Sequence, residues 1–261
     1  MGLRLCSLGS GSSGTCTFVG SEATGLLIDA GLTARETIRR LAEIGVGIDQ
    51  VSAICLTHEH ADHVAGVEVL HRRHGLKLYA NSATIEGFEG RGERGGLQWS
   101  VFTTGMAFRI GDFDVEPFSV PHDAYDPVGF VLRRGGLKIG IATDIGIVTG
   151  LIRERLRDCD AVVVESNHDE QMLKAARRPW PIKQRILGRQ GHLSNAAAAE
   201  LLGEIASPRL VQVFLAHLSA DCNRPELALR TVVDALQQRG HDHIVVKVAH
   251  RQTVSEVWVR E

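Results

Sequence analysis

Hydrophobic residues in the first quarter of the chain form short runs that are separated by turns rich in Gly and Ser. Residues 3–7, 15–19 and 25–28 are such runs, and they predict β-strands. Residues 33–44 carry apolar side chains at helical spacing and predict a helix. Residues 53–56 form another short apolar run, which predicts a buried strand leading directly into a polar stretch.

The rest of the chain alternates between strand-like and helical patterns. We expect a helix at residues 63–74, because Val64, Val67 and Leu70 share one helical face. Residues 101–142 are mostly strand-like. The later predicted strands are 113–119, 128–133, 138–142, 161–165, 211–215, 244–248 and 254–259, and the later predicted helices are 151–157, 195–205 and 225–239.

The order of these elements predicts the fold class. Strands come first and mixed strands and helices follow, in two similar halves without a fixed-period repeat or a clear linker. Two sheets packed face to face with helices outside would accommodate this order. We therefore predict an α/β protein with a four-layer αββα sandwich, formed by a single domain over residues 1–261.

Composition excludes several classes of protein. The 261 residues are 44% hydrophobic and 23% charged, with a net charge of −2, so any nucleic-acid binding must come from a local basic patch. The five cysteines are scattered without a C-x-x-C pair, which favours reduced thiols over disulfides or a Cys-rich zinc site. No signal-peptide core or run of 18 apolar residues occurs, so we expect a cytoplasmic protein without a membrane partner.

Residues 89–96 are rich in glycine and charged residues. We interpret them as a surface linker rather than an RNA-binding segment.

One stretch carries an unusual density of metal-binding side chains, His58-Glu59-His60-Ala61-Asp62-His63. It fits the pattern H-x-H-x-D-H and lies on a predicted strand-to-helix loop, where a rigid scaffold holds functional residues. On such a turn His58 and His60 can point at one ion, while Asp62 and His63 serve a neighbouring ion. Imidazoles and carboxylates suit Zn²⁺, Mn²⁺ or Fe²⁺.

Three further polar residues follow apolar strands and complete the predicted metal centre. They are His122, Asp144 and His217. A single His or Asp at a strand end is more often a cap or a core hydrogen-bonding group. Together with the upstream motif we interpret the three as ligands, with Asp144 bridging two divalent ions.

These residues resemble the successive metal-site motifs of the metallo-β-lactamase superfamily, beginning with Leu27-Ile28-Asp29-Ala30-Gly31. Within it the chain looks most similar to the YycJ/WalJ group of bacterial exonucleases. The stretches that support this group are residues 8–16, 165–169, 178–180, 191–195 and 215–219. The resemblance implies a 5′-to-3′ exonuclease on DNA, with a hydroxide activated by two metal ions per chain. Zn²⁺ and Mn²⁺ suit the ligands comparably, and the resemblance favours Mn²⁺.

A proton donor for the leaving oxygen is predicted downstream of the metal motifs. His192 can donate the proton, with Glu165 orienting its ring, and the pair resembles the carboxylate–histidine arrangement of tRNase Z. His168 is a second candidate, for the acid or for a phosphate contact; a structural histidine is the alternative. Asp62 is also placed among the catalytic residues. Asp29 is expected to support the motif loop through hydrogen bonds rather than to bind metal.

A local basic stretch indicates how a polyanion could be bound. Residues 174–189 contain Lys and Arg but no acidic residue, and Arg178, Lys183 and Arg185 are candidate phosphate contacts. Trp180 could stack a base or pack into the core. The Gly/Ser turn at residues 9–14 lacks a Walker ending, yet Ser12 and Ser13 could contact a phosphate if the turn is more than a plain tight turn.

Other functions remain open from the sequence. RNA processing or cleavage of small nucleotide phosphodiesters would use the same centre, and the 2′-hydroxyl would separate RNA from DNA. The basic stretch and the Glu165/His192 pair argue against a lactone or thioester hydrolase. A full set of ligands argues against a metal-binding module without turnover. The oligomeric state is not predicted.

Overall fold

The computed structural model describes residues 2–90 and 96–261. The chain forms two compact units. Unit 1 comprises Met1–Pro117, Ala124–Val128 and His250–Glu261, and unit 2 comprises Phe118–Asp123 and Gly129–Ala249. Each unit has a buried hydrophobic cluster of its own. A single domain over residues 1–261 stays a prediction.

Unit 1 contains a mixed seven-stranded sheet in the order β14-β1-β2-β3-β4-β5-β6. Its strands are β1 (Leu3–Gly9), β2 (Cys16–Gly20), β3 (Gly25–Ile28), β4 (Val51–Cys55), β5 (Lys77–Ala80), β6 (Trp99–Val101) and β14 (Trp258–Arg260). Strands β3 to β6 are parallel neighbours, and Ile28 pairs with Cys55. The carboxyl ends of β3 and β4 therefore meet at one edge of this sheet.

The helices of unit 1 follow its parallel strands. They are α1 (Ala34–Glu43), the 3₁₀ helix η1 (Ile48–Gln50), α2 (Ala61–Val64), α3 (Val67–His74) and α4 (Ser82–Glu89). Helix α1 begins where the Thr33 hydroxyl accepts a hydrogen bond from the Glu36 amide. Its buried face includes Leu41, which belongs to the hydrophobic cluster of unit 1. A short antiparallel pair is formed by β7 (Phe108–Ile110) and β8 (Phe113–Ser119).

Unit 2 contributes five neighbouring strands in the order β13-β12-β11-β10-β9. They are β9 (Val128–Arg134), β10 (Leu137–Ala142), β11 (Ala161–Glu165), β12 (Gln212–Ala216) and β13 (Val245–Val248). Strands β10 to β13 are parallel, and the central strands β11 and β12 are buried along their whole length, as is typical of parallel strands. Their carboxyl ends therefore share one edge.

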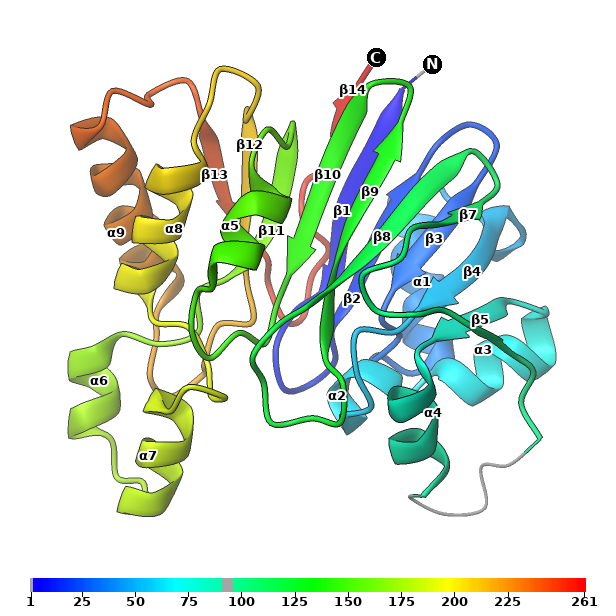
Figure 1. Cartoon of the computed structure of the whole chain (residues 1–261), viewed down its shortest axis with the longest axis horizontal. Helices are drawn as coiled ribbons and strands as arrows, with labels where there is room; N and C mark the ends of the chain where they lie inside the picture. The colour runs from blue at the N-terminus through cyan, green and yellow to red at the C-terminus, as the bar shows by residue number, and fades with distance from the viewer. Residues whose placement is uncertain (1, 91–95) are drawn as a thin grey trace. The chain divides into compact units, whose positions relative to one another are not determined.

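Five helices belong to unit 2. They are α5 (Gly150–Leu156), α6 (Glu170–Ala175), α7 (Trp180–Leu187), α8 (Asn195–Ile205) and α9 (Pro225–Gln238). Helices α5, α8 and α9 pack on one another and on the strands of this unit, whereas α6 and α7 lie away from those strands (Figure 1). Helix α7 has no buried residue. The segment from α6 to α7 is therefore held by few core contacts.

The predicted helix at residues 63–74 is wrong as a single element. The chain forms α2 and α3 instead, with a break at Gly66. The Gly66 amide donates a hydrogen bond to Ala30 O at 2.8 Å, and a Cβ at this position would lie 2.3 Å from Leu32 O. Tertiary contact with the segment after β3 therefore interrupts a continuous helical pattern.

Other elements also differ from the prediction. Strands β5, β6 and β7, the 3₁₀ helix η1 and helices α4, α6 and α7 carry weak or short patterns, and we did not predict them as separate elements. The last strand was expected at residues 254–259 but is β14, because Ser255 instead exchanges hydrogen bonds with Ser7. The interpretation of residues 89–96 as a linker falls largely on residues 91–95, which lie outside the described residues.

Candidate active site

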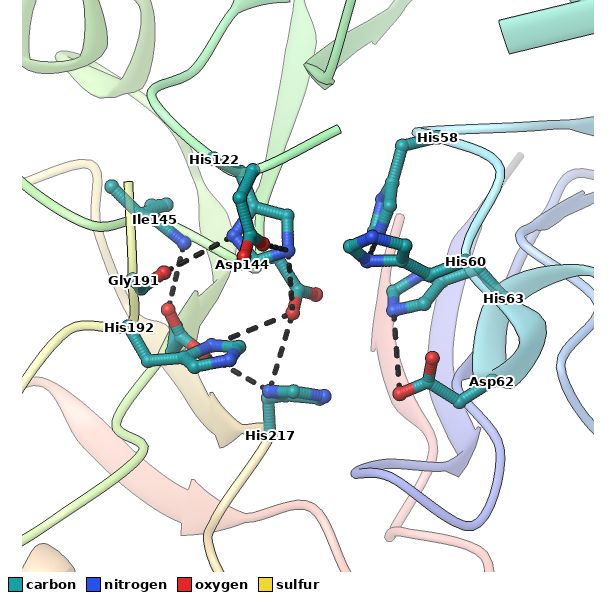
Figure 2. A network of polar contacts seen from close by, with 12 residues as sticks. His58, His60, Asp62, His63, His122, Asp144, Ile145, Gly191, His192 and His217 are labelled. Atoms are coloured by element: carbon teal, nitrogen blue, oxygen red, sulfur yellow. Dashed lines mark hydrogen bonds and ion pairs between the residues drawn. The ribbon is translucent and has the colours of Figure 1, made fainter. Parts of the chain in front are cut away.

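The histidine motif lies in unit 1, on the loop from β4 into α2. His58 follows the strand, His60 is the N-cap residue of α2, and Asp62 and His63 lie within its single turn. His58 and His63 are 1% and 0% exposed. Nε2 of His58 lies 2.9 Å from Nδ1 of His60, and the rings of His58 and His63 have centroids 4.1 Å apart (Figure 2). The loop thus gathers three imidazoles within one small volume.

Asp29 fixes the orientation of this loop. Its carboxylate accepts hydrogen bonds from the Thr57 amide and hydroxyl, each at 2.8 Å, and from Nδ1 of His63 at 2.8 Å. Because a carboxylate can only accept, His63 carries its proton on Nδ1 and presents Nε2 as a ligand atom. The Thr57 hydroxyl, which donates to Asp29, accepts in turn from Nδ1 of His58 at 2.9 Å, so His58 also presents Nε2.

The backbone around Asp29 contacts the histidine motif directly. Asp29 has φ 61°, a left-handed conformation that Asp adopts more readily than most residues. The next amide, Ala30 N, donates to His63 O at 2.8 Å, and Thr15 N donates to Asp62 O at 2.7 Å. A Cβ at Gly31 would lie 1.6 Å from Asp62 O, so only glycine fits there. The loop after β3 therefore holds α2 through main-chain contacts.

A second cluster lies in unit 2, where parallel strands end. Asp144, Glu165 and His217 follow or close the neighbouring strands β10, β11 and β12. Asp144 and His217 have φ 56° and 57°. Asp and His are among the residues that tolerate this conformation best, and it turns both side chains off the ends of their strands.

Three histidines surround the Asp144 carboxylate (Figure 2). Oδ1 of Asp144 lies 3.4 Å from Nδ1 of His217, 3.6 Å from Nδ1 of His192 and 3.8 Å from Nε2 of His122. Nδ1 of His122 is also 3.1 Å from Gly191 O, to which it can donate a hydrogen bond. Four residues of this cluster, Asp144, Glu165, His192 and His217, offer ligand atoms that all lie within 4.8 Å of one another.

Glu165 is the buried anchor of the second cluster. Its Oε1 accepts hydrogen bonds from Nδ1 of His192 at 2.8 Å and from Nδ1 of His217 at 3.0 Å. Its Oε2 accepts from the Ile145 amide at 2.7 Å and the Leu193 amide at 3.1 Å. The carboxylate therefore orients both imidazoles and leaves their Nε2 atoms facing outward from it.

The electrostatics of this pair favour a charged form of each partner. Burial is the strongest influence on the pKa of Glu165 and raises it, but the charge and hydrogen bond of His192 and the hydrogen bond of His217 outweigh burial and lower the pKa to about 2. Burial is also the strongest influence on the pKa of His192 and lowers it. Attraction to Glu165, their hydrogen bond and the charge of Asp144 together raise that pKa above its usual value.

The donor atoms of the motif cluster suit a divalent cation. Two imidazole nitrogens that both present lone pairs repel each other unless a cation or a proton lies between them. The 2.9 Å between His58 Nε2 and His60 Nδ1 approaches the roughly 3.3 Å separating two nitrogen ligands of a tetrahedral ion with Zn–N bonds of about 2.0–2.1 Å. Nitrogen and carboxylate donors without thiolate fit Zn²⁺ and Mn²⁺ alike.

His168 occupies a different environment from His192. It is 1% exposed, and neither ring nitrogen has a hydrogen-bond partner among the described residues. Burial, the strongest influence, lowers the pKa of its imidazole despite the charge of Glu165. The ring is therefore neutral at neutral pH and holds a proton less readily than His192.

The predicted substrate contacts lie on exposed segments. Trp180 on α7 is 59% exposed, which excludes the alternative of a core residue. Arg178 pairs with Asp221 at 2.5 Å, Arg185 pairs with Asp123, and Lys183 Nζ donates to Lys174 O at 2.6 Å. Ser12 and Ser13 are exposed in the turn after β1, and Arg251 donates to the Ser12 hydroxyl at 3.4 Å.

Unit 2 also contains an open pocket of about 730 Å³, whose lining includes the two residues that flank His122 in sequence. The residues that line it are Pro121, Asp123, Ile147, Thr149, Arg185, Gly188, Arg189 and Gln190. We missed this pocket and the bridging role of Thr57 in the sequence. The hydroxyl directly before the motif was a signal for Thr57, whereas no pattern along the chain indicates the pocket.

Comparison with known proteins defines the family. Residues 24–214 match the model of the beta-lactamase superfamily domain. The chain is 38% identical to exodeoxyribonuclease YycJ of Bacillus anthracis, over 92% of this chain and 91% of that protein. It is 36% identical to exodeoxyribonuclease WalJ of Streptococcus pneumoniae serotype 2, over 91% and 90%. The metallo-β-lactamase fold protein YhfI of Bacillus subtilis, 16% identical, superposes over 100% of both chains with a TM-score of 0.76.

The chain therefore belongs to the beta-lactamase superfamily of hydrolases, in the group that contains YycJ and WalJ. The predicted resemblance and fold class are confirmed: two mixed sheets with helices form a metallo-β-lactamase fold. His and Asp residues are positioned for metal binding in this fold. Among residues 2–90 and 96–261, no helix is long and apolar enough to cross a membrane.

Proposed function

We propose that the chain is a metal-dependent nuclease that degrades DNA in the 5′-to-3′ direction. Its likeness over nearly its whole length to two proteins named exodeoxyribonucleases carries this proposal. The Glu165–His192 pair adds chemical support. An alkoxide leaving group needs a proton, whereas the thiolate that leaves a thioester can depart without one.

The proposed metal ligands are those predicted from the motifs, His58, His60, Asp62, His63, His122, Asp144 and His217. Two divalent ions, Mn²⁺ or Zn²⁺, would supply a water nucleophile at neutral pH and neutralise charge on the phosphodiester. Asp29 orients His63 for this role, and Glu165 orients His217. Asp62 is also proposed to assist catalysis.

His192 is the proposed proton donor. Its Nδ1–H is held by Glu165, so the second proton of the imidazolium resides on Nε2, from which it can pass to the departing oxygen. The raised pKa of His192 favours this charged form near neutral pH. The lowered pKa of His168 favours a phosphate or structural contact for that residue instead.

The segment from α6 to α7 is proposed as part of the DNA-binding surface. Arg178, Lys183 and Arg185 would contact phosphates and Trp180 would stack a base; Ser12 and Ser13 are proposed phosphate contacts in unit 1. The exposure of Trp180 and the absence of buried side chains on α7 support this role. We also propose a cytoplasmic location, which is supported by five free, buried cysteines.

The decisive experiment is digestion of single- and double-stranded DNA labelled at the 5′ or 3′ end, with Mn²⁺, Zn²⁺ or Mg²⁺ added. We expect mononucleotides to be released first from the 5′ end. RNA of the same sequence is assayed in parallel, and a preference for RNA would replace the DNA proposal with RNA processing. Metal-loaded protein that cleaves neither polymer nor a bis-aryl phosphodiester would contradict the proposal.

Two variants connect activity to the proposed ligands. His58→Ala and Asp144→Asn should abolish cleavage while the circular dichroism spectrum is kept. Asn is preferred over Ala at position 144, because Asn tolerates the left-handed backbone there. Exposed residues of the same types provide the matched controls, His74→Ala in unit 1 and Asp234→Asn in unit 2.

A further inference from the structure

A short segment of unit 1, Ala124–Val128, presents an exposed aromatic ring from a firmly held backbone. Tyr125 is 65% exposed. The next residue, Asp126, is bound by side chains from other elements. Asn81 Nδ2 donates to the Asp126 carbonyl at 2.8 Å, and the Thr104 hydroxyl donates to the Asp126 side-chain carboxylate at 2.7 Å. The Val128 amide donates to Thr57 O at 3.0 Å.

The metal motif itself supplies another of these contacts. Glu59, between His58 and His60, is 2% exposed, and its Oε1 accepts a hydrogen bond from the Tyr125 amide at 3.2 Å. The same motif loop carries Thr57, whose carbonyl receives the Val128 amide. The segment that bears Tyr125 is thus tied at two points to the loop that bears the histidines.

The ring of Tyr125 rests on a glycine of α4. A Cβ at Gly87 would lie 2.9 Å from Cδ2 of Tyr125 and 2.6 Å from Cγ of Glu59, so a side chain at this position would displace one of them. The absence of a side chain at Gly87 therefore lets the tyrosine and the glutamate lie close against the helix. Much of the ring stays open to solvent.

Single exposed aromatic residues are common on protein surfaces and need no function. Tyr125 differs because the backbone of its segment makes three hydrogen bonds to other elements, two of them to the metal motif loop, and the Asp126 side chain makes a fourth. An aromatic ring on a fixed backbone loses little conformational entropy when a flat ligand stacks on it. Unpaired nucleobases are such ligands, and stacking tolerates any base sequence because every base has a π-face.

We propose that Tyr125 is a stacking residue for an unpaired nucleobase of the substrate, and that Glu59 and Gly87 position it. The proposal rests on the proposed nuclease function and adds the residue that binds a base near the motif loop. It implies that the protein binds its substrate through a base as well as through phosphates. It also implies that DNA with a single-stranded end is preferred over fully paired DNA.

Binding to metal-free protein in EDTA tests the proposal without turnover. The probe is a short oligothymidylate in which one thymine is replaced by 2-aminopurine, whose fluorescence is quenched when it stacks. A series of probes places the 2-aminopurine at each position of the strand in turn. Tyr125→Ala should weaken binding roughly 5- to 150-fold, as expected for loss of about 1–3 kcal/mol of base stacking, and should reduce the quenching. Tyr125→Phe should keep both, because the ring remains. Met106→Ala, which removes a side chain that is also 65% exposed in unit 1, should leave both unchanged.

Turnover of single-stranded DNA separates binding from chemistry. With metal added, Tyr125→Ala should raise KM and leave kcat near the wild-type value. Gly87→Ala should also raise KM, although Tyr125 itself is unchanged, because the added Cβ would displace the tyrosine ring.

The outcomes distinguish the two proposals. If the wild type binds and cleaves DNA while Tyr125→Ala binds as tightly and quenches as strongly, the stacking role is wrong and the nuclease function stands. If the wild type neither binds nor cleaves nucleic acid, both proposals fall.

Discussion

Nδ1 of His63 donates a hydrogen bond to Oδ2 of Asp29 at 2.8 Å, and both side chains are almost completely buried. Asp29→Asn should weaken metal binding about 10- to 100-fold, the range typical for loss of a carboxylate that orients a metal-binding histidine. The Asn amide can present its NH₂ group to His63 and so favour the wrong tautomer. Competition with a chromophoric chelator measures the affinity.

The exposed Asp49 in η1 provides the control for this prediction. Asp49→Asn should bind metal as the wild type does. A normal affinity in Asp29→Asn would mean that the hydrogen bond to His63 has no influence on the metal centre.

Removal of the proposed proton donor should depend on the leaving group. His192→Ala should reduce kcat on DNA roughly 10²- to 10⁴-fold, the usual contribution of general acid catalysis. Its effect on bis(p-nitrophenyl) phosphate should be much smaller, because p-nitrophenolate departs without a proton. Steady-state kinetics on both substrates, with metal content measured, provide the test.

His168→Ala is the comparison for His192→Ala, because both residues were candidates for the acid. It should affect the two substrates by similar factors. If His168→Ala instead shows the larger dependence on leaving group, the roles of the two histidines are reversed.

The Glu165–His192 pair should make the stability of the metal-free protein depend on pH. The pKa of Glu165 is lowered to about 2, so its contribution is present above its unfolded pKa near 4.5 and is lost as pH falls toward 2. The pKa of His192 is raised, so its contribution is fully present below its unfolded pKa near 6.5 and is lost as pH rises through the folded value. The pair stabilises the fold most between about pH 4.5 and 6.5.

Thermal unfolding in EDTA from pH 3 to 9 measures this effect. Glu165→Gln should lower Tm by roughly 3–10 °C in the window of maximum stabilisation, as expected for about 1.5–3 kcal/mol in a hydrogen bond to a charged group. The difference from wild type should shrink at both ends of the range. A difference that is constant with pH would show that the substitution acts through packing alone.

The local pattern of the chain was sufficient for the elements that carry the motifs. The strands Phe113–Ser119 and Ala161–Glu165 and the helix Asn195–Ile205 have the predicted bounds, because their apolar periodicity agrees with their tertiary burial. The histidine motif could be placed on a strand-to-helix loop for the same reason. Its density of metal-binding side chains was visible without any knowledge of the fold.

What could not be predicted depends on contacts between distant segments. Gly66 interrupts a helical pattern because its amide donates a hydrogen bond to Ala30 O, and the residues around Gly66 do not indicate that contact. The position of Tyr125 depends on Glu59 and Gly87, which lie 66 and 38 residues away in sequence. Such positions require the path of the whole chain.

The five cysteines should be unreactive in the folded protein. All are buried, and burial raises the pKa of Cys159 to about 12 and raises those of Cys6, Cys16 and Cys55. The thiolate is the reactive form of cysteine. Titration with Ellman's reagent at pH 8 should therefore find almost no reactive thiol in the native protein and five after denaturation. Rapid labelling of the native protein would reveal local opening of a unit.

The charges of the segment from α6 to α7 should determine the salt dependence of DNA binding. Each phosphate contact with single-stranded DNA contributes about 0.7 to the slope of log K against log salt concentration. Replacing Arg178, Lys183 and Arg185 together by Gln should therefore reduce the slope by up to about 2. Among the three single replacements, Lys183→Gln should reduce the slope most, because Arg178 and Arg185 are already paired with Asp221 and Asp123.

The matched control removes three exposed arginines of unit 1, Arg35, Arg72 and Arg73, and keeps the change in net charge the same. Its slope should stay near that of the wild type if binding depends on local contacts. Equal slopes for the two triple variants would mean that net charge, rather than the α6–α7 segment, governs affinity. Fluorescence anisotropy of a labelled single strand from 50 to 300 mM KCl, with metal omitted, distinguishes these results.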